Sequence, residues 1–431
     1  MKKNILLTSV VSLTGLALIA CSQPVTPKKV SANKDYKLGA VAGTEYSQKI
    51  TPQVDILFVI DDSGSMAEEQ AKLRKTLPTL IKNLGTHLDW QVAVTRSWDD
   101  KKTYGYGAKK IDTKFVPATV EDLGGARPMI KGELLPVIDP GTGEIYTTKI
   151  GKRDVAQRFI NKRTASAETP NYEKFLEKHF DIGVRGYLNG GPNHEVLMDS
   201  AREALTKTTK AGKINDGFLR HGSRLVLVFL TDAPDDSSYD IADYEATFRS
   251  IAISNLKSGA QLEEIEAALT VYAIVPFKGG CAAGNLQGDR DPDINGLKLP
   301  EELRTYQLVQ SLMTSKTSDY TFDICSSDKV YQNKMDLLGA SIKKGTKIYV
   351  NLTSGRPDDR LQVWYGKGKP GTESFVGKQL VDVGYNDDWY YENKNGKDRI
   401  VVNLSAFDKY NLDTVAGEIK LLDYYPDQKA K

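Results

Sequence analysis

The sequence predicts an α/β protein whose main part is a doubly wound, mostly parallel sheet, followed by a small C-terminal β-domain. Three observations support this prediction. Strands and helices alternate over residues 48–345, several of the strands are almost wholly apolar, and residues 346–431 change to strands alone. Alternating strands and helices are typical of βαβ units, and a strand buried on both faces of a parallel sheet has no polar side.

The apolar strands are the clearest elements. We predict buried strands at Val54–Ile60 (VDILFVI), Leu225–Thr231 (LVLVFLT) and Leu269–Val275 (LTVYAIV), with a further strand at Trp90–Thr95. A helix follows the first strand, because leucines recur at helical spacing from Leu73 to Leu84. Further helices are expected at Glu195–Leu205, Glu301–Leu312 and Lys334–Lys343.

Two regions depart from this alternation. Residues 97–190 are rich in Gly, Lys and Asp and are too long for an ordinary connection, so we expect a functional insertion or a small subdomain, with a hairpin around Ile138–Ile145. In the C-terminal β-domain, no constellation of charged or aromatic residues indicates a ligand. Its strands are predicted at Lys347–Leu352, Leu361–Tyr365, Arg399–Leu404 and Glu418–Tyr425.

Residues 1–20 have the pattern of an export signal. Lys2 and Lys3 precede a short apolar stretch that ends in Leu18-Ile19-Ala20-Cys21, which resembles a bacterial lipobox. Cys21 would then carry diacylglycerol and further acyl chains such as palmitate, and residues 21–47 would form a flexible tether. The alternative is an ordinary signal peptide. We expect a lipid-anchored envelope protein, at the outer membrane if the cell is Gram-negative, because no aspartate follows Cys21.

Charge and cysteine content limit the classes of partner. The chain has 58 basic and 56 acidic residues, and removing Lys2 and Lys3 leaves 56 of each, so nothing indicates nucleic-acid binding. With Cys21 lipidated, Cys281 and Cys325 remain as an even pair in an oxidising compartment. We expect a disulfide between them, with two free buried thiols as the alternative.

Oxygen-bearing side chains follow two of the buried strands. Asp61, Ser63 and Ser65 come directly after the first strand, and Asp232 comes directly after Leu225–Thr231. The carboxyl ends of central strands in an open α/β sheet line the crevice where ligands bind. Oxygen ligands suit a hard cation such as Mg²⁺, and a partner's carboxylate can complete its coordination. The alternative is a solvated turn rich in Asp and Ser.

This arrangement resembles the metal-ion-dependent adhesion site (MIDAS) of von Willebrand factor type A (vWA) domains. The resemblance covers residues 48–345 and implies a Rossmann-like fold with the ion, held by Asp61, Ser63, Ser65 and Asp232, at the top of the sheet. The wider pattern is similar to vWA lipoproteins of predatory and social Gram-negative bacteria.

One element departs from the family. Its middle loop normally supplies a threonine, whereas residues 189–195 contain none; Asn193 or Glu195 would have to substitute, or Glu195 caps the following helix. Asp62, Asp235 and Asp236 lie close by in sequence, and we interpret them as a solvated acidic rim, with support of the metal ligands as the alternative.

A second cation motif occurs near the end of the α/β region. Asp291, Asp293, Asn295 and Glu302 have the spacing of an EF-hand calcium loop, with Gly296 at the turn. No helix precedes this segment, so a polar turn before a helix is the favoured interpretation and Ca²⁺ binding the alternative.

No enzymatic motif is found. There is no Gly-x-Ser-x-Gly elbow, and the four histidines (His87, His179, His194 and His221) show no metal-ligand spacing. Two non-enzymatic functions remain. The chain is either a receptor that binds an acidic group of a protein or glycan through the ion, or an envelope assembly or scaffold protein whose metal site is structural or vestigial.

Overall fold

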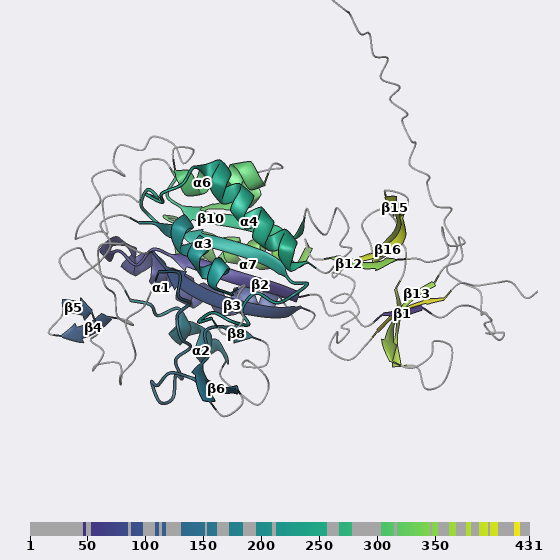
Figure 1. The fold of residues 1–431 in the computed structure, drawn as a ribbon, viewed down its shortest axis with the longest axis horizontal. Helices are drawn as coiled ribbons and strands as arrows, with labels where there is room; N and C mark the ends of the chain where they lie inside the picture. The colour runs from purple at the N-terminus through teal and green to yellow at the C-terminus, as the bar shows by residue number, and fades with distance from the viewer. Residues whose placement is uncertain are drawn as a thin grey trace, which may run out of the picture. The chain divides into compact units, whose positions relative to one another are not determined.

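The computed structural model contains a six-stranded mixed sheet with helices on both faces (Figure 1). Neighbouring strands are parallel, except that β8 runs antiparallel to β3. Across the sheet the order is β11 (Thr321–Asp323), β10 (Leu269–Val275), β9 (Arg224–Leu230), β2 (Gln53–Ile60), β3 (Asp89–Arg96) and β8 (Ile160–Asn161). The structure describes residues 46–48, 53–84, 88–97, 108–111, 114–117, 131–150, 153–161, 172–183, 195–208, 213–256, 267–277, 303–313, 317–344, 347–351, 362–367, 376–380, 388–394, 397–403 and 418–422.

The strand order identifies where the chain reverses direction across the sheet. Numbered along the chain, the six strands lie in the order 3-2-1-4-5-6, which is a common order in doubly wound α/β proteins. β2 and β9 are the central neighbours, and ligands of such sheets bind at the carboxyl ends of these two strands. The predicted α/β class with a mostly parallel sheet is confirmed.

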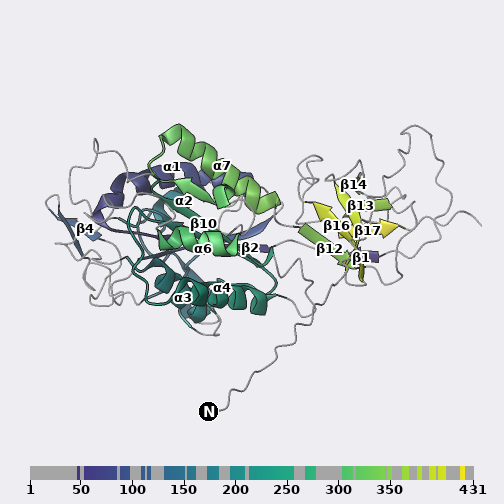
Figure 2. The same ribbon diagram turned by 90° about the horizontal axis from the view of Figure 1, so that it is seen from above.

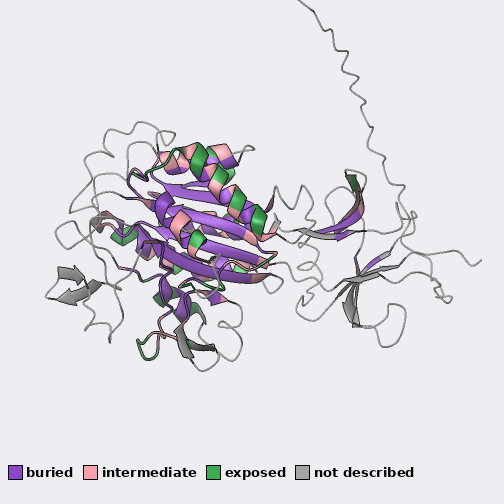
Figure 3. Cartoon of the chain, viewed as in Figure 1, coloured by how far each residue is buried: buried purple, intermediate pink, exposed green. Residues whose placement is uncertain are grey.

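Strand β2 shows why the apolar runs become central strands. Its residues from Val54 to Ile60 are buried, and alternate side chains enter two different cores. Phe58 packs in the first core and Leu57 in the second, as expected when successive side chains point to opposite faces. Figure 3 shows this burial across the neighbouring strands.

Helices complete both cores. Figure 2 shows α1 and α7 on one face of the sheet and α3 and α4 on the other. The first core contains residues of α1 (Ala67–Leu84), α2 (Tyr172–His179) and α7 (Asp328–Lys344). The second contains residues of α3 (Leu197–Thr208), α4 (Ile241–Asn255) and α6 (Arg304–Leu312). None of these helices, nor any other in the described part of the chain, is long and apolar enough to cross a membrane.

The predicted insertion is partly built into the α/β core. Its expected hairpin forms, with Ile138 bridged to Ile145 and Gly143 at a φ of 75°. The same stretch also supplies β8 and α2. Gly132 lies so close to α3 that a Cβ there would come within 2.4 Å of the Ala204 nitrogen. The remaining described parts are two hairpins, β4 (Ala108–Ile111) with β5 (Lys114–Pro117) and β6 (Thr147–Ile150) with β7 (Arg153–Ala156).

The strands after α7 form two antiparallel sheets. One contains β12 (Lys347–Asn351), β16 (Lys397–Asn403) and β15 (Trp389–Lys394). The other contains β17 (Glu418–Leu422), β13 (Gln362–Lys367), β14 (Val376–Leu380) and β1 (Tyr46–Gln48), which pairs with β17. The chain therefore contributes one strand to this sheet before β2. Residues 46 and 47, predicted to belong to the tether, are part of that strand.

Candidate metal centre

The candidate site begins where β2 ends. The Asp61 backbone N–H donates to the Leu230 carbonyl at 2.9 Å, which ties the end of β2 to the end of β9. The Gln70 side chain of α1 donates to the Asp61 carbonyl at 3.0 Å. A 3-10 turn, η1 (Gly64–Met66), then leads directly into α1. The loop that carries Ser63 and Ser65 is thus held between two strands and a helix.

Side-chain oxygens from two distant segments meet in this loop. The hydroxyls of Ser63 and Ser65 are 3.0 Å apart, and the Ser65 hydroxyl donates to Asp232 Oδ1 at 3.0 Å. Asp61 Oδ1 accepts from the Ser63 N–H at 2.8 Å. The structure therefore brings Asp61, Ser63, Ser65 and Asp232 together at the carboxyl ends of β2 and β9.

Thr231 is a residue of this site that the sequence analysis did not single out. Its hydroxyl donates to Asp61 Oδ2 at 2.9 Å and accepts from the Ala233 N–H at 3.0 Å. It therefore fixes the orientation of the Asp61 carboxylate from the β9 side. Its position directly before Asp232 was the signal available in the sequence.

The two carboxylates of the site lie close together in a buried environment. Burial raises the pKa of Asp61 to about 6. Burial also raises the pKa of Asp232 to about 8, and the charges of Asp61 and Glu69 add to this effect. Among the described residues, no lysine, arginine or histidine forms an ion pair with Asp61 or Asp232. The site thus concentrates negative charge that a divalent cation would balance.

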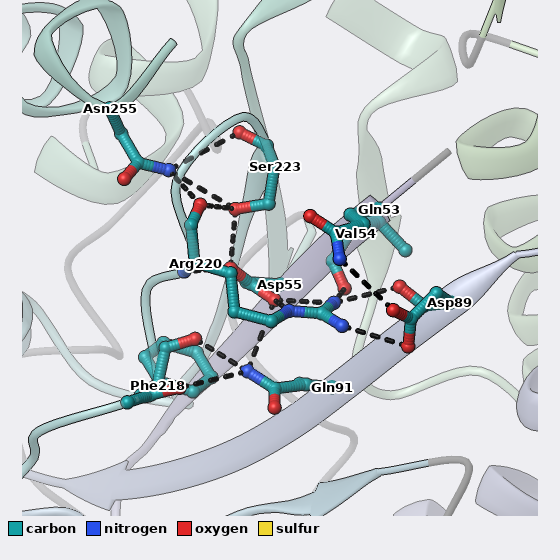
Figure 4. Close-up of polar contacts among 10 residues, drawn as sticks. Gln53, Val54, Asp55, Asp89, Gln91, Phe218, Arg220, Ser223 and Asn255 are labelled. Carbon is teal, nitrogen blue, oxygen red and sulfur yellow. Dashed lines mark hydrogen bonds and ion pairs between the residues drawn. The ribbon is translucent and has the colours of Figure 1, made fainter. Parts of the chain in front are cut away.

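A third aspartate, Asp55 on β2, has the opposite surroundings. Asp55 is fully buried near the amino end of β2, and its carboxylate accepts from the backbone N–H of Arg220 at 2.7 Å and from its Nε at 2.8 Å (Figure 4). Ser223 also donates to Asp55, and Arg220 pairs with Asp89 at 2.8 Å. Burial raises the pKa of Asp55, whereas the Arg220 charge opposes this effect. This cluster holds the segment before β9 against β2 and β3.

The interpretation of the neighbouring aspartates as a solvated rim is wrong for two of the three. Asp62 is fully buried and pairs with Arg96 at 3.3 Å. Asp235 is buried and accepts from the Met198 N–H at 3.0 Å. Asp236 alone is exposed. The two buried residues are structural supports of the loops around the site.

The middle loop is described only from Glu195 onward, so Asn193 and His194 lie outside the described residues. Glu195 is buried, and its backbone bridges Asp235 and accepts from the Asp236 N–H at 2.7 Å. Two N–H groups of the first turn of α3 are bound by Asp235 and by Ser237, which follow Asp232. The capping role considered for Glu195 stays a prediction.

Several other predicted sites lie outside the described residues. These are the lipidation residue Cys21, the calcium-loop residues Asp291, Asp293, Asn295 and Glu302, and Cys281. Cys325 is disulfide-bonded; its pairing with Cys281 stays a prediction. Of the histidines, His179 is buried, and burial lowers its pKa to about 4, whereas His221 is exposed.

The donor set fits a hard divalent cation. In the described part of the chain, no group of three or more His, Cys, Asp or Glu side chains is placed to hold a metal ion. The site at Asp61 and Asp232 instead combines two carboxylates with two hydroxyls. Such all-oxygen sets suit Mg²⁺ or Ca²⁺ and lack the nitrogen and sulfur ligands that Zn²⁺ prefers.

Comparisons with known proteins do not assign a family. No protein-family model and no curated protein matches the sequence. Three solved structures are similar at 10–11% identity. Proximal thread matrix protein 1 from the mussel byssus has a TM-score of 0.31, with 72% of this chain and 50% of that chain covered. The pilus adhesin SpaC from Lactobacillus rhamnosus GG has a TM-score of 0.32 (91% of this chain, 44% of that chain), and the pilus adhesin RrgA from Streptococcus pneumoniae has a TM-score of 0.28 (88% of this chain, 57% of that chain). The chain thus spans about half the length of the mussel protein. At these TM-scores the similarities support no functional argument.

Proposed function

We propose that this chain is a vWA-type binding protein that holds Mg²⁺ or another divalent cation and uses it to bind an acidic group of a protein or glycan. The observation that carries the proposal is the contact of Ser65 with Asp232, which joins segments 167 residues apart at 3.0 Å. The doubly wound strand order, with Asp-x-Ser-x-Ser directly after β2, agrees with the Rossmann-like fold that the vWA resemblance implies.

The residues of the site divide into ligands and a support in this proposal. The hydroxyls of Ser63 and Ser65 and the carboxylates of Asp61 and Asp232 would hold the ion, and Thr231 would orient Asp61. A bound divalent cation supplies a Lewis acid whose remaining coordination positions can accept a partner's carboxylate. Because two ligands are neutral hydroxyls, the ion would keep much of its positive charge for that partner.

The location of the chain is part of the proposal. We propose that lipidation of Cys21 anchors it in the cell envelope and that residues 22–45 span the distance between the membrane and the folded part. A binding site on a tethered domain would hold its partner at the membrane surface.

Calorimetric titration with Mg²⁺ at pH 8 tests the ion site. Asp232→Asn is expected to weaken Mg²⁺ binding at least about 100-fold, since losing groups that only support a ligand already costs roughly 10–100-fold. Asp236→Asn is the matched control, because this residue is exposed on the same loop; it should stay within about twofold of the wild type. Absence of Mg²⁺ uptake by the wild-type chain would refute the ion site.

Capture from envelope extracts tests the binding role. The wild-type chain and Asp236→Asn should retain the same component in Mg²⁺ and lose it in EDTA, and Asp232→Asn should not retain it. Retention that is equal in EDTA and in Asp232→Asn would instead favour the assembly or scaffold function, in which the metal site is structural or vestigial.

A further inference from the structure

The loop that follows Asp232 is held from two sides by residues far away in the sequence. It runs from Ala233 to Asp240 and connects β9 to α4. The side chains of Asp235 and Ser237 accept from the first backbone N–H groups of α3, at 3.0 Å each. On its α3 side, the loop therefore caps the N-terminus of α3 with the side chains of Asp235 and Ser237.

On its other side the loop is held by one arginine. Arg304, the first residue of α6, donates to the carbonyl of Asp235 at 3.3 Å and also to the carbonyls of Ser237 and Tyr239. The carbonyls of residues 235, 237 and 239 thus share one partner. A planar guanidinium has five donors in a fixed fork and can satisfy all three carbonyls at once.

We infer that Arg304 is a positioning residue for the metal site, an inference that rests on the proposed function. The hydrogen bond between Ser65 and Asp232 requires the backbone after β9 to keep its conformation. Arg304 binds the carbonyls of the third, fifth and seventh residues after Asp232, and it contacts none of the proposed ligands. Its loss should therefore leave the ligand set complete but let Asp232 move away from the two serines.

Lysine at this position is the informative substitution. Arg304→Lys keeps the positive charge but replaces the fork with a single ammonium, which cannot reach three carbonyls in the same way. Arg304→Gln removes the charge as well. Both variants are expected to weaken Mg²⁺ binding by roughly 10–100-fold, the range observed when groups that orient metal ligands are removed.

A second arginine provides the matched control. Arg249 on α4 donates to the Leu312 carbonyl at the other end of α6, at 3.3 Å, and so also joins α6 to a neighbouring element. Among the described residues it bonds to Glu245 and to the Leu312 carbonyl, and not to the loop after Asp232. Arg249→Lys and Arg249→Gln should bind Mg²⁺ within about twofold of the wild type, because a general loosening of α6 is not expected to move Asp232.

The experiment is a calorimetric Mg²⁺ titration of the full chain at pH 8, at a temperature where circular dichroism shows every variant folded. Weakened binding in both Arg304 variants, with the Arg249 variants unchanged, supports the inference. Wild-type affinity in Arg304→Lys overturns the inference and leaves the proposed function intact, provided that Asp232→Asn still fails to bind. Equal weakening in the Arg249 and Arg304 variants also overturns the inference. Absence of Mg²⁺ uptake by the wild-type chain overturns both the inference and the proposed function.

Discussion

Asp55 and Asp61 lie near opposite ends of β2, both fully buried, and their surroundings differ in the sign of the nearest charge. Asp55 is paired with Arg220, whose guanidinium opposes the effect of burial on the Asp55 pKa. At the other end, the pKa of Asp232 is raised by burial and further by the charge of Asp61. Buried aspartates at the two ends of β2 thus serve different purposes.

The comparison shows how a structural carboxylate is distinguished from a candidate ligand. A buried charge is costly unless it is paired and hydrogen-bonded. Asp55 meets this condition within the protein, through Arg220 and Ser223. Among the described residues, the Asp61 and Asp232 carboxylates receive hydrogen bonds from neutral donors only, and no cationic side chain is paired with them.

The largest expected effect is at the Asp55 end. Arg220→Ala leaves Asp55 buried without its counter-charge, and breaking such a pair costs about 3–5 kcal/mol of unfolding free energy. Arg249→Ala, which removes a partly exposed pair with Glu245, should cost less than about 1 kcal/mol. Urea denaturation of both variants measures the difference. A similar small loss in both would mean that Asp55 does not depend on Arg220.

The second expected effect is on the pH dependence of Mg²⁺ affinity. In the metal-free protein the pKa values of about 6 for Asp61 and about 8 for Asp232 mean that Mg²⁺ must displace protons below pH 8. The affinity should rise by up to about tenfold per pH unit as one proton is displaced, and level off above pH 8. Calorimetric titrations from pH 6 to pH 9 measure this, and an affinity that does not change with pH contradicts it.

The smallest expected effect is on the stability of the metal-free protein. The raised pKa of Asp232 means that its stabilising contribution is complete below the ordinary aspartate pKa of 3.8 and is lost as the pH rises through about 8. Asp232→Asn has no charge to bury, so in EDTA at pH 9 it should be more stable than the wild type by about 1 kcal/mol or more.

This gain should shrink toward pH 4, where the wild-type carboxyl is protonated. Asp236→Asn should show no such gain, because Asp236 is exposed. If Asp232→Asn is less stable than the wild type at every pH, the carboxylate is structural, as at Asp55.

Much of the α/β fold was predictable because its signals are local. The apolar runs of β2, β9 and β10 were assigned within one residue at either end, since strands buried on both faces need apolar side chains throughout. Helix α4 was missed although Tyr244, Phe248 and Ala252 recur at helical spacing, so its signal was present. Strands β8 and β11 are two and three residues long, too short to form a pattern.

The candidate site was predictable in part for the same reason. Asp61, Ser63 and Ser65 follow one apolar strand and Asp232 follows another, and parallel strands end at the same edge of a sheet. The burial of Asp62 and Asp235 was not predictable, because their partners Arg96 and Met198 are 34 and 37 residues away in the chain. A charged residue next to a turn is usually solvated unless a distant partner reaches it.

The sequence by itself determined which segments are buried and which residues follow them, because burial depends on the local run of side chains. The tertiary structure alone decided that β2 and β9 are neighbours, that Asp55 is paired with Arg220 whereas Asp61 accepts from the Thr231 hydroxyl, and that Arg304 binds the loop after Asp232. Such contacts depend on the course of the whole chain in space, since two residues far apart in sequence meet only when the elements between them have packed.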